Sequence, residues 1–499
     1  MKLQKIKFLL AISIISTLFF TSCKNEQSGG TGWNYNDPNN GGFQKIPYLE
    51  QETGPGLVLI EGGRFTMGRV EQDVNYDWNN IPRTVTISSF YMDEVEVSNF
   101  FYTEYLYWLS RVYSADYPEV YQKAVPDTLV WRSKLGYNEP YVEYYLRHPA
   151  YRDYPVVGVN WLQANDYCAW RTDRVNELIL IREGLFEHYP NQINEDNFNT
   201  EAYLAQQYES GKRVDGIPDL NPNIEYRNVR VEDGILLPKY RLPTEAEWEF
   251  AAFGLIGNTI DELIPDKKLY PWNGHAVRNS NEKYIGTILA NFKRGRGDNM
   301  GVAGGLNDNA DVTAPVYAYW PNDYGLYNMA GNVSEWVMDV YRPLSLEDND
   351  DFRPFRGNVY QTKILDEDGA IAEKDSLGHI LYRDVDTKED NLQSRRNYRT
   401  ADNINHQDGD WESNIKYTEA EMGSNPHFDK EDGKKTMYEF GISTLVNDKA
   451  HVYKGASWKD RAYWMVPGTR RHLSQDQSTD YIGFRCAMTR LGSPVGMGY

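Results

Sequence analysis

The first third of the chain alternates hydrophobic and polar positions as strands do, and later segments repeat them at helical spacing. The run GPGLVLIEGGRFTMG holds two short strand-like stretches on either side of Gly62 and Gly63, which predicts a hairpin. The stretch RTVTISSFYMDEVEVS continues the period-two alternation. Ser98 is a favourable N-cap and predicts a helix after it. We expect the apolar face of this helix to comprise Phe101, Tyr105, Trp108, Leu109 and Val112.

Two further helices are predicted by their capping residues. In YPVVGVNWLQANDYCAWR, residues 156–159 predict a short buried strand and Asn160 caps the helix that follows. This helix is expected to place Trp161, Ala164 and Cys168 on one side. In YRLPTEAEWEFAAFG, a capping box and a glycine just past the end predict the third helix. These capping positions are Thr244, Glu247 and Gly254.

Two long polar stretches interrupt these patterned segments, at about residues 172–240 and 344–450. They contain acidic runs such as EDNDDF, DEDG and QDGDWE, which are typical of solvated loops. Stretches of this length inside a compact domain are usually functional or disordered. We therefore interpret them as two insertions in one domain that spans residues 53–490, with a tail at 491–499.

The N-terminus has the pattern of an export signal. Three lysines precede an apolar run of 13 residues, Phe8–Phe20, and small residues lead to Cys23. This run is shorter than the roughly 20 residues that a membrane-spanning helix needs. It predicts a lipoprotein signal peptide over residues 1–22 with Cys23 as the lipidated residue. An ordinary secretory signal with an incidental cysteine is the alternative. The Gly- and Asn-rich residues 23–52 are expected to form a flexible tether.

Composition limits the class of protein. A hydrophobic fraction of 40% with 13 tryptophans is enough for a substantial core, and 40 glycines with 38 tyrosines indicate a loop-rich fold. The formal charge of −20 argues against a nucleic-acid partner, because phosphate binding needs clustered Lys and Arg. The same charge fits a protein that takes up divalent cations.

The cysteine count is small. If Cys23 carries lipid, only Cys168 and Cys486 remain. In an exported protein two thiols most simply form one disulfide. Two buried free thiols are the alternative.

Seven motifs occur in a fixed order: GGRFTMG, DEVEVSN, NWLQANDYCAW, RLPTEAEWEFAA, GLYNMAGNVSEW, KGASW and GFRC. Together they resemble the formylglycine-generating enzyme (sulfatase-modifying factor) family over about Gly54 to Arg490. The resemblance implies an irregular α+β fold related to C-type lectins, with little regular secondary structure and the two insertions. It also implies that Cys168 pairs with Cys486.

Within this family, the chain is most similar to a group of Bacteroidetes lipoproteins. The similarity rests on the lipoprotein signal that ends at Cys23 (the lipobox) and on the segments TGWNYNDPNNGGFQ, GRVEQDVNYDWNN and YWPNDYGLYNMAGNVSEWVMDVY. These are the gliding-motility and type IX secretion lipoproteins of the GldJ type, related to GldK and PorK. The resemblance implies a non-catalytic structural component, anchored by lipid in the outer membrane and facing the periplasm. Its implied partners are other lipoproteins of this machinery and outer-membrane ring components.

The chemistry of the active oxidases is missing from this chain. Those enzymes bind copper(I) through two cysteines that follow the glycine–serine–aromatic turn, because two soft thiolates suit that ion. The corresponding positions here are Asp460 and Met465, and no cysteine lies in residues 455–485. We therefore expect no copper and no enzyme activity. If both positions lie at the surface, alanine there should cost about 1 kcal/mol or less, whereas Trp458→Ala should cost about 3–5 kcal/mol if buried.

Other catalytic sites have little support. The eight histidines contain no closely spaced ligand pair, so a non-haem iron enzyme is only a minor alternative. Ser457 lies in a turn without a nearby base in the sequence. An active sulfatase-modifying oxidase and a glycan-binding lectin-like module stay open as alternative functions.

The resemblance further implies two structural calcium sites, which would use side-chain and backbone oxygens. The first comprises Asn291, Phe292, Asp308 and Ala310. The second comprises Asn328, Gly331, Val333 and Glu335. From the residues alone, turns capped by Asn and Asp side chains explain both segments equally simply.

Overall fold

The structure is a computed structural model of the chain. It describes residues 26–40, 43–69, 76, 79–208, 216–221, 224–256, 267–296, 308, 310–342, 351–357, 359, 361–384 and 449–492. The predicted signal peptide, Cys23, and residues 385–448 of the second insertion lie outside the described residues.

Two small sheets form the centre of the fold. The strands of the first, in spatial order, are β1 (Leu57–Ile60), β4 (Phe90–Asp93), β14 (Ala487–Thr489) and β7 (Tyr240–Arg241), all antiparallel. Those of the second are β12 (Arg471–Ser474), β11 (Ala450–Lys454), β8 (Ser334–Val340) and β13 (Ile482–Gly483), where β13 pairs with β8 in parallel. The strands β13 and β14 belong to different sheets, so the GFRC motif joins the two.

The hairpin predicted around Gly62 and Gly63 is wrong. β1 pairs with β4, while β2 (Gly63–Met67) pairs with β3 (Arg83–Ile87) in a sheet of two strands. The chain changes sheets at Gly62, where a Cβ atom would lie 2.3 Å from the carbonyl oxygen of Ile87. The glycines therefore serve a close backbone approach rather than a hairpin turn.

The three predicted helices form with their predicted caps. They are α2 (Asn99–Tyr113), α5 (Trp161–Arg182) and α7 (Glu245–Phe253). Capping boxes occur at Asn160 with Gln163 and at Thr244 with Glu247. Residues 156–159 are buried as expected but form no strand.

The buried face of α2 differs in part from the expected one. Phe101 is 44% exposed and Trp108 is half-buried. The buried positions on α2 include Tyr102, Tyr105, Leu106, Leu109 and Val112. Tyr102 stacks on Tyr167 of α5 with ring centroids 5.7 Å apart, so the face that meets α5 determines burial.

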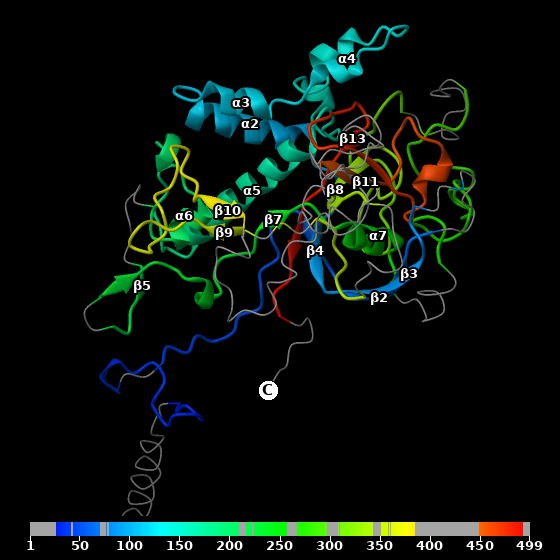
Figure 1. The fold of residues 1–499 in the computed structure, drawn as a ribbon. Coiled ribbons are helices and arrows are strands. Elements are labelled where there is room, and N and C mark those ends of the chain that lie inside the picture. The colour runs from blue at the N-terminus through cyan, green and yellow to red at the C-terminus, as the bar shows by residue number, and fades with distance from the viewer. Residues whose placement is uncertain are drawn as a thin grey trace, which may run out of the picture.

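Two short helices extend from α2. They are α3 (Pro118–Ala124) and α4 (Glu139–Tyr144). Figure 1 shows α2, α3 and α4 at one end of the molecule, with α7 and the strands β8 and β11 beyond α5. The described residues before β1 extend away from the body at the bottom of the view (Figure 1).

The two insertions pack against each other. α5 continues to Arg182, past the expected start of the first insertion. The described elements of the insertions are α6 (Thr200–Leu204), β5 (Ile217–Pro218), β6 (Tyr226–Arg227), β9 (Gln361–Lys363) and β10 (Tyr382–Asp384). The side chain of Gln207 donates to the carbonyl oxygens of Ile371 and Ala372 at 3.0 and 2.9 Å. We call residues 183–239 and 361–384 together the accessory lobe.

The accessory lobe has a hydrophobic core of its own. The buried residues of this core are Leu180, Phe186, Phe198, Tyr203, Tyr208 and Val229. The insertions are polar in sequence, yet their described residues form a small packed unit beside α5. In this unit α6, β9 and β10 lie close together (Figure 1). No helix among the described residues has the length and apolar character needed to cross a bilayer.

Candidate functional site

The turn that follows β11 contains the two positions where the resemblance places copper-binding cysteines. Asp460 folds back onto this turn, because the backbone N–H and the hydroxyl of Ser457 both donate to its Oδ2, at 2.9 and 2.7 Å. Arg471 of β12 pairs with the same carboxylate through two nitrogens, at 2.8 and 2.9 Å. The carboxylate is therefore held by four hydrogen bonds, two of which form a bidentate ion pair with Arg471.

Arg471 is held as firmly as its partner. Its guanidinium lies between the rings of Tyr453 and Trp464, at 4.8 and 4.6 Å from their centroids. It also donates to the Ser334 hydroxyl and to the Gly455 carbonyl, each at 3.0 Å. Stacked guanidinium groups of this kind are stabilised by the ring faces as well as by charge. The sequence analysis did not identify Arg471. The only signal for this partner was the presence of an arginine 11 positions after Asp460.

Neither position lies at the surface, so the condition attached to a small cost of alanine there is not met. The side chain of Asp460 is 15% exposed. Met465 is fully buried, in a cluster that includes Ile288 and Phe292. Trp458 is half-buried rather than buried, and it stacks on Trp131 at 6.1 Å.

The turn has no arrangement for nucleophilic catalysis. The Ser457 hydroxyl donates to a carboxylate that Arg471 already neutralises. Such a carboxylate is a poor general base, because the guanidinium stabilises its ionised form. No group of three or more His, Cys, Asp or Glu side chains gathers as a metal site within the described residues.

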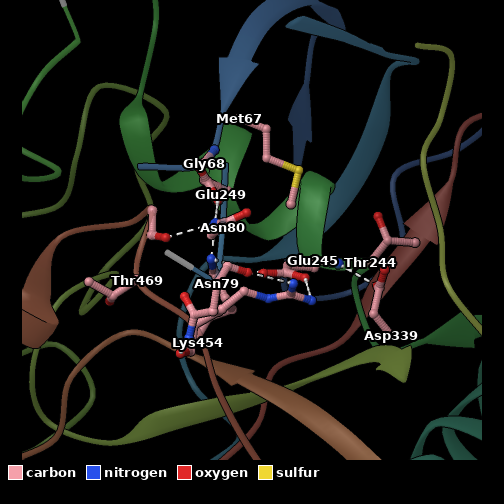
Figure 2. A network of polar contacts seen from close by, with 12 residues as sticks. Met67, Gly68, Asn79, Asn80, Thr244, Glu245, Glu249, Asp339, Lys454 and Thr469 are labelled. Atoms are coloured by element: carbon pink, nitrogen blue, oxygen red, sulfur yellow. Dashed lines mark hydrogen bonds and ion pairs between the residues drawn. The ribbon is translucent and has the colours of Figure 1, made fainter. Parts of the chain in front are cut away.

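A second polar network surrounds Lys454, which precedes the turn in sequence (Figure 2). Lys454, at the end of β11, is completely buried and contacts two carboxylates of α7: Glu245 Oε1 at 3.2 Å and Glu249 Oε2 at 3.1 Å. Glu249 also accepts from the backbone N–H of Gly68, and Asn80 donates to the Gly468 carbonyl, both at 2.7 Å. This network joins α7 to segments far apart in sequence.

The network also contains a carboxyl group that favours the neutral form. Asp339 accepts from the backbone N–H of Glu245 at 2.7 Å. Burial raises the pKa of Asp339 to about 7, and the nearby Glu245 carboxylate adds to the rise. Arg470 pairs with Glu245 at 2.8 Å and balances part of this charge. We interpret the network as structural, since every charged member has a partner.

The predicted second calcium group forms one buried cluster. Glu335 is paired with Arg485 through both oxygens, at 2.6 and 2.7 Å, and accepts from the indole of Trp248 at 2.7 Å. Asn328 donates its side-chain amide to the buried carboxylate of Glu96 at 2.9 Å. Burial raises the pKa of Glu96 to about 8, and the neighbouring Glu335 carboxylate contributes. Two buried carboxylates beside one guanidinium, with amide and backbone oxygens around them, suit a hard divalent cation.

The residues of the predicted first calcium group share fewer contacts than those of the second. The Asn291 side chain donates to the Val312 carbonyl at 2.7 Å, and the Asn291 carbonyl accepts from the Asn332 N–H at 2.9 Å. Asp308 accepts from the N–H of Ala310 at 3.4 Å. Asn291 is thus turned toward the second group, and calcium at the first group stays a prediction.

The two remaining cysteines lie side by side. Cys168 of α5 and Cys486, just before β14, are both buried thiols with their sulfur atoms 3.4 Å apart. Burial raises the pKa of the Cys486 thiol well above its ordinary value, and Cys168 contributes. The placement suits the predicted pair, while the bond itself stays a prediction.

The fold and these motifs define a class of protein with the formylglycine-generating enzyme architecture. The model of the family described as "Sulfatase-modifying factor enzyme 1-like domain" matches residues 42–380. Because this is more than half of the chain, the protein belongs to that family, and the predicted α+β fold with little regular secondary structure is confirmed. The closing turn with Asp460 lies outside the matched range.

Relatives of known activity and relatives named inactive both match. The chain is 26% identical to the formylglycine-generating enzyme of Mus musculus over 306 residues, covering 57% of this chain and 58% of that enzyme. It is 24% identical to the inactive C-alpha-formylglycine-generating enzyme 2 of Mus musculus over 354 residues, covering 68% and 84%. The chain thus spans little more than half of the active mouse enzyme.

Two further proteins, with different names, are also similar to this chain. The chaperone protein LppX of Paenibacillus barcinonensis is 26% identical over 292 residues, covering 57% of this chain and 71% of that protein. The structure of PvdO from Pseudomonas aeruginosa has a TM-score of 0.40 at 16% identity, covering 89% of this chain and all of that chain.

Proposed function

We propose that this protein is a lipid-anchored, non-catalytic structural component of the gliding-motility and type IX secretion machinery. The observation that carries the proposal is the Asp460–Arg471 pair, which fills the place of the catalytic cysteines with a charge-neutral structural contact. A family that includes a relative named as inactive supports the loss of catalysis. The motility and secretion role rests on the resemblance of the lipobox and the flanking segments.

The proposal includes the location and the partners. Cys23 carries the lipid, and the body faces the periplasm from the outer membrane. The accessory lobe is a suitable surface for other lipoproteins or for ring components, because it is a packed unit added to the family core. Calcium at the second group and a Cys168–Cys486 disulfide complete the proposed structural role.

The experiment uses variants that remove the chemistry of the turn without disturbing its packing. A strain carrying Asp460→Asn and Met465→Leu should spread and export a secretion reporter like the parent strain once expression is adjusted to give equal amounts of the protein. A strain that lacks the protein should lose both activities. If the double variant is present at normal levels and both activities vanish, the turn performs chemistry or binds a partner, and the proposal is wrong.

A glycan-binding module is the second candidate, and one cavity favours it. The cavity has a volume of about 460 Å³. Its wall includes Tyr141, Tyr151, Tyr154 and Trp320, together with the acidic residue Asp311. Aromatic faces beside a few polar groups are typical of small-molecule sites. A glycan array with the full chain and with Tyr151→Ala tests it, and Tyr144→Ala, which alters an exposed tyrosine of α4 outside the cavity, is the matched control.

A further inference from the structure

Glu96 is a completely buried carboxylate that belongs to neither predicted calcium group. It lies in the DEVEVSN segment between β4 and α2. Its Oε2 accepts from the side-chain amides of Asn328 and Asn332, each at 2.9 Å. Its Oε1 accepts from the backbone N–H of Val333 at 3.4 Å. One side chain therefore contacts three residues of the loop that carries the second calcium group.

That loop has an unusual backbone. Asn328, Gly331 and Asn332 all have positive φ values, of 53°, 82° and 62°. Left-handed conformations cost energy at residues other than glycine, so surrounding contacts must hold them. A Cβ atom on Gly331 would lie 2.3 Å from the carbonyl oxygen of Asn291, so the loop is also pressed closely against the first group. Glu96 holds both of the left-handed asparagines.

The amide contacts also determine which atoms of Asn328 remain for a ligand. Its Nδ2 donates one hydrogen to Glu96 and one to the Val316 carbonyl, both at 2.9 Å. Both amide hydrogens are then used, which turns the Oδ1 atom away from Glu96 and leaves it as the ligating atom.

The cluster holds two carboxylates, Glu96 and Glu335, and the one guanidinium of Arg485 acts on both. Arg485 binds both oxygens of Glu335. The hydrogen bonds that Glu96 accepts come from amide and backbone N–H groups, and these carry no full charge. A buried carboxylate that has to share its cationic partner is costly in the ionised form. A divalent cation at the second group would compensate both carboxylates together.

We propose that Glu96 is a positioning residue for the second calcium site: it holds Asn328 and Asn332 in their left-handed conformations and supplies the buried charge that favours the ion. This inference rests on the proposed calcium site. Glu96 acts through the loop and is not itself assigned as a ligand.

The test compares the full chain with Glu96→Gln. Glutamine can still accept from Asn328 and Asn332 through one oxygen, so the variant removes the charge and keeps most of the contacts. Thermal unfolding is recorded with calcium and with a chelator, and calcium affinity is measured by calorimetry. Terbium luminescence excited through the tryptophans is a second readout, since the Trp248 indole contacts Glu335. Glu249→Gln, at a buried carboxylate in the separate Lys454 network, is the matched control.

We expect Glu96→Gln to bind calcium at least ten-fold more weakly and to unfold in chelator at the same temperature as the unchanged chain or higher. Glu249→Gln should lose stability equally with and without calcium.

If the unchanged chain binds neither calcium nor terbium, the calcium site itself fails and this inference fails with it. If the unchanged chain binds and Glu96→Gln binds equally well, or loses stability equally in both conditions, the inference is overturned while the calcium site stands. Glu96→Asp, which keeps the charge, serves if Glu96→Gln does not fold, and it should retain calcium-dependent stabilisation.

Discussion

At the scale of single residues, Asp460 and Arg471 form a structural contact at the position where the resemblance places a copper-binding cysteine. The carboxylate closes the turn through Ser457, and the guanidinium joins that turn to β8 and β12. Met465 beside it packs into a hydrophobic cluster. Residues of this kind stabilise the fold, whereas a thiol pair at a substrate cleft would serve the reaction.

The first prediction concerns this ion pair. Asp460→Ala should lower the free energy of unfolding by about 2–4 kcal/mol, because Arg471 is left largely buried and unpaired. Asp476→Ala, at an acidic residue on the same segment that bonds only locally to Ser474, should change it by about 0.5 kcal/mol or less. Urea denaturation measures both. Equal effects of the two variants would show that the pair carries no stability.

The second prediction concerns His451, whose ring stacks on Trp161 at 3.7 Å. Burial lowers the pKa of His451 to about 4, below its ordinary value of 6.5. The folded state therefore favours the neutral ring, and its contribution is complete above about pH 6.5 and is lost as pH falls toward 4. His451→Phe removes this titration and keeps an aromatic ring on Trp161.

The difference in unfolding free energy between the unchanged chain and His451→Phe should shift by about 3 kcal/mol from pH 7 to pH 4, with the unchanged chain losing more. Subtracting the two curves removes the opposite contribution of Asp339, whose raised pKa makes the protein less stable as pH rises from about 4 to 7. Parallel curves across this range would mean that the His451 ring is protonated as readily in the folded protein as in the unfolded chain.

At the scale of elements, local capping was predictable and strand pairing was not. Thr244 with Glu247 and Asn160 with Gln163 form the capping boxes that adjacent residues encode. The pairing of β4 with β14 joins segments nearly 400 positions apart in sequence, and β1 pairs with β4 past the intervening strands β2 and β3. No local pattern specifies either pairing. The buried face of α2 was predicted only in part, because α5 decides which side is covered.

The same limit applied to the candidate site. The positions of Asp460 and Met465 could be located by counting from the glycine–serine turn, and the second calcium group by its motif. Their surroundings could not, since Arg471, Glu96 and Lys454 come from separate elements. Long-range partners of this kind decide burial and charge, and they appear only once the chain is folded.

The third prediction concerns the network that joins α7 to β11. Lys454→Met should cost about 3–5 kcal/mol, because it leaves the buried Glu249 carboxylate without a cation and Glu245 with Arg470 alone. The double variant Lys454→Met/Glu249→Gln should recover at least about 1 kcal/mol of that loss, since it removes the uncompensated charge. Denaturant unfolding of the unchanged chain, the two single variants and the double variant measures the coupling. Simple addition of the two single effects would contradict it.

At the scale of the whole molecule, the C-terminal segment closes the structure. β13 and β14 enter different sheets, and Phe484 and Cys486 between them are completely buried. The accessory lobe adds a second packed unit that comprises parts of both insertions. The sequence predicted two insertions, with the first expected to start inside what is α5, but not that they meet, because neither one contains its whole contact surface.

The fourth prediction concerns Cys168 and Cys486, whose sulfur atoms lie side by side where the C-terminal segment packs on α5. Non-reducing peptide mapping of the exported protein should find Cys168 linked to Cys486. Closing so long a loop should stabilise the fold by up to about 5 kcal/mol in the chain-entropy model, so a reductant should lower the unfolding temperature. Cys168→Ala/Cys486→Ala should be insensitive to the reductant. Two free thiols in the map would favour the alternative of a buried dithiol.

The central claim is that this protein keeps the fold of its family but does not carry out the copper-dependent oxidation of cysteine. The purified full chain is loaded with copper(I), and a peptide with a sulfatase-type cysteine is added in air, with an active formylglycine-generating enzyme assayed in parallel. Mass spectrometry of the peptide and metal analysis of the protein give the result. We predict no retained copper and an unmodified cysteine. Copper bound in proportion to protein, together with formylglycine in the peptide, would contradict the account.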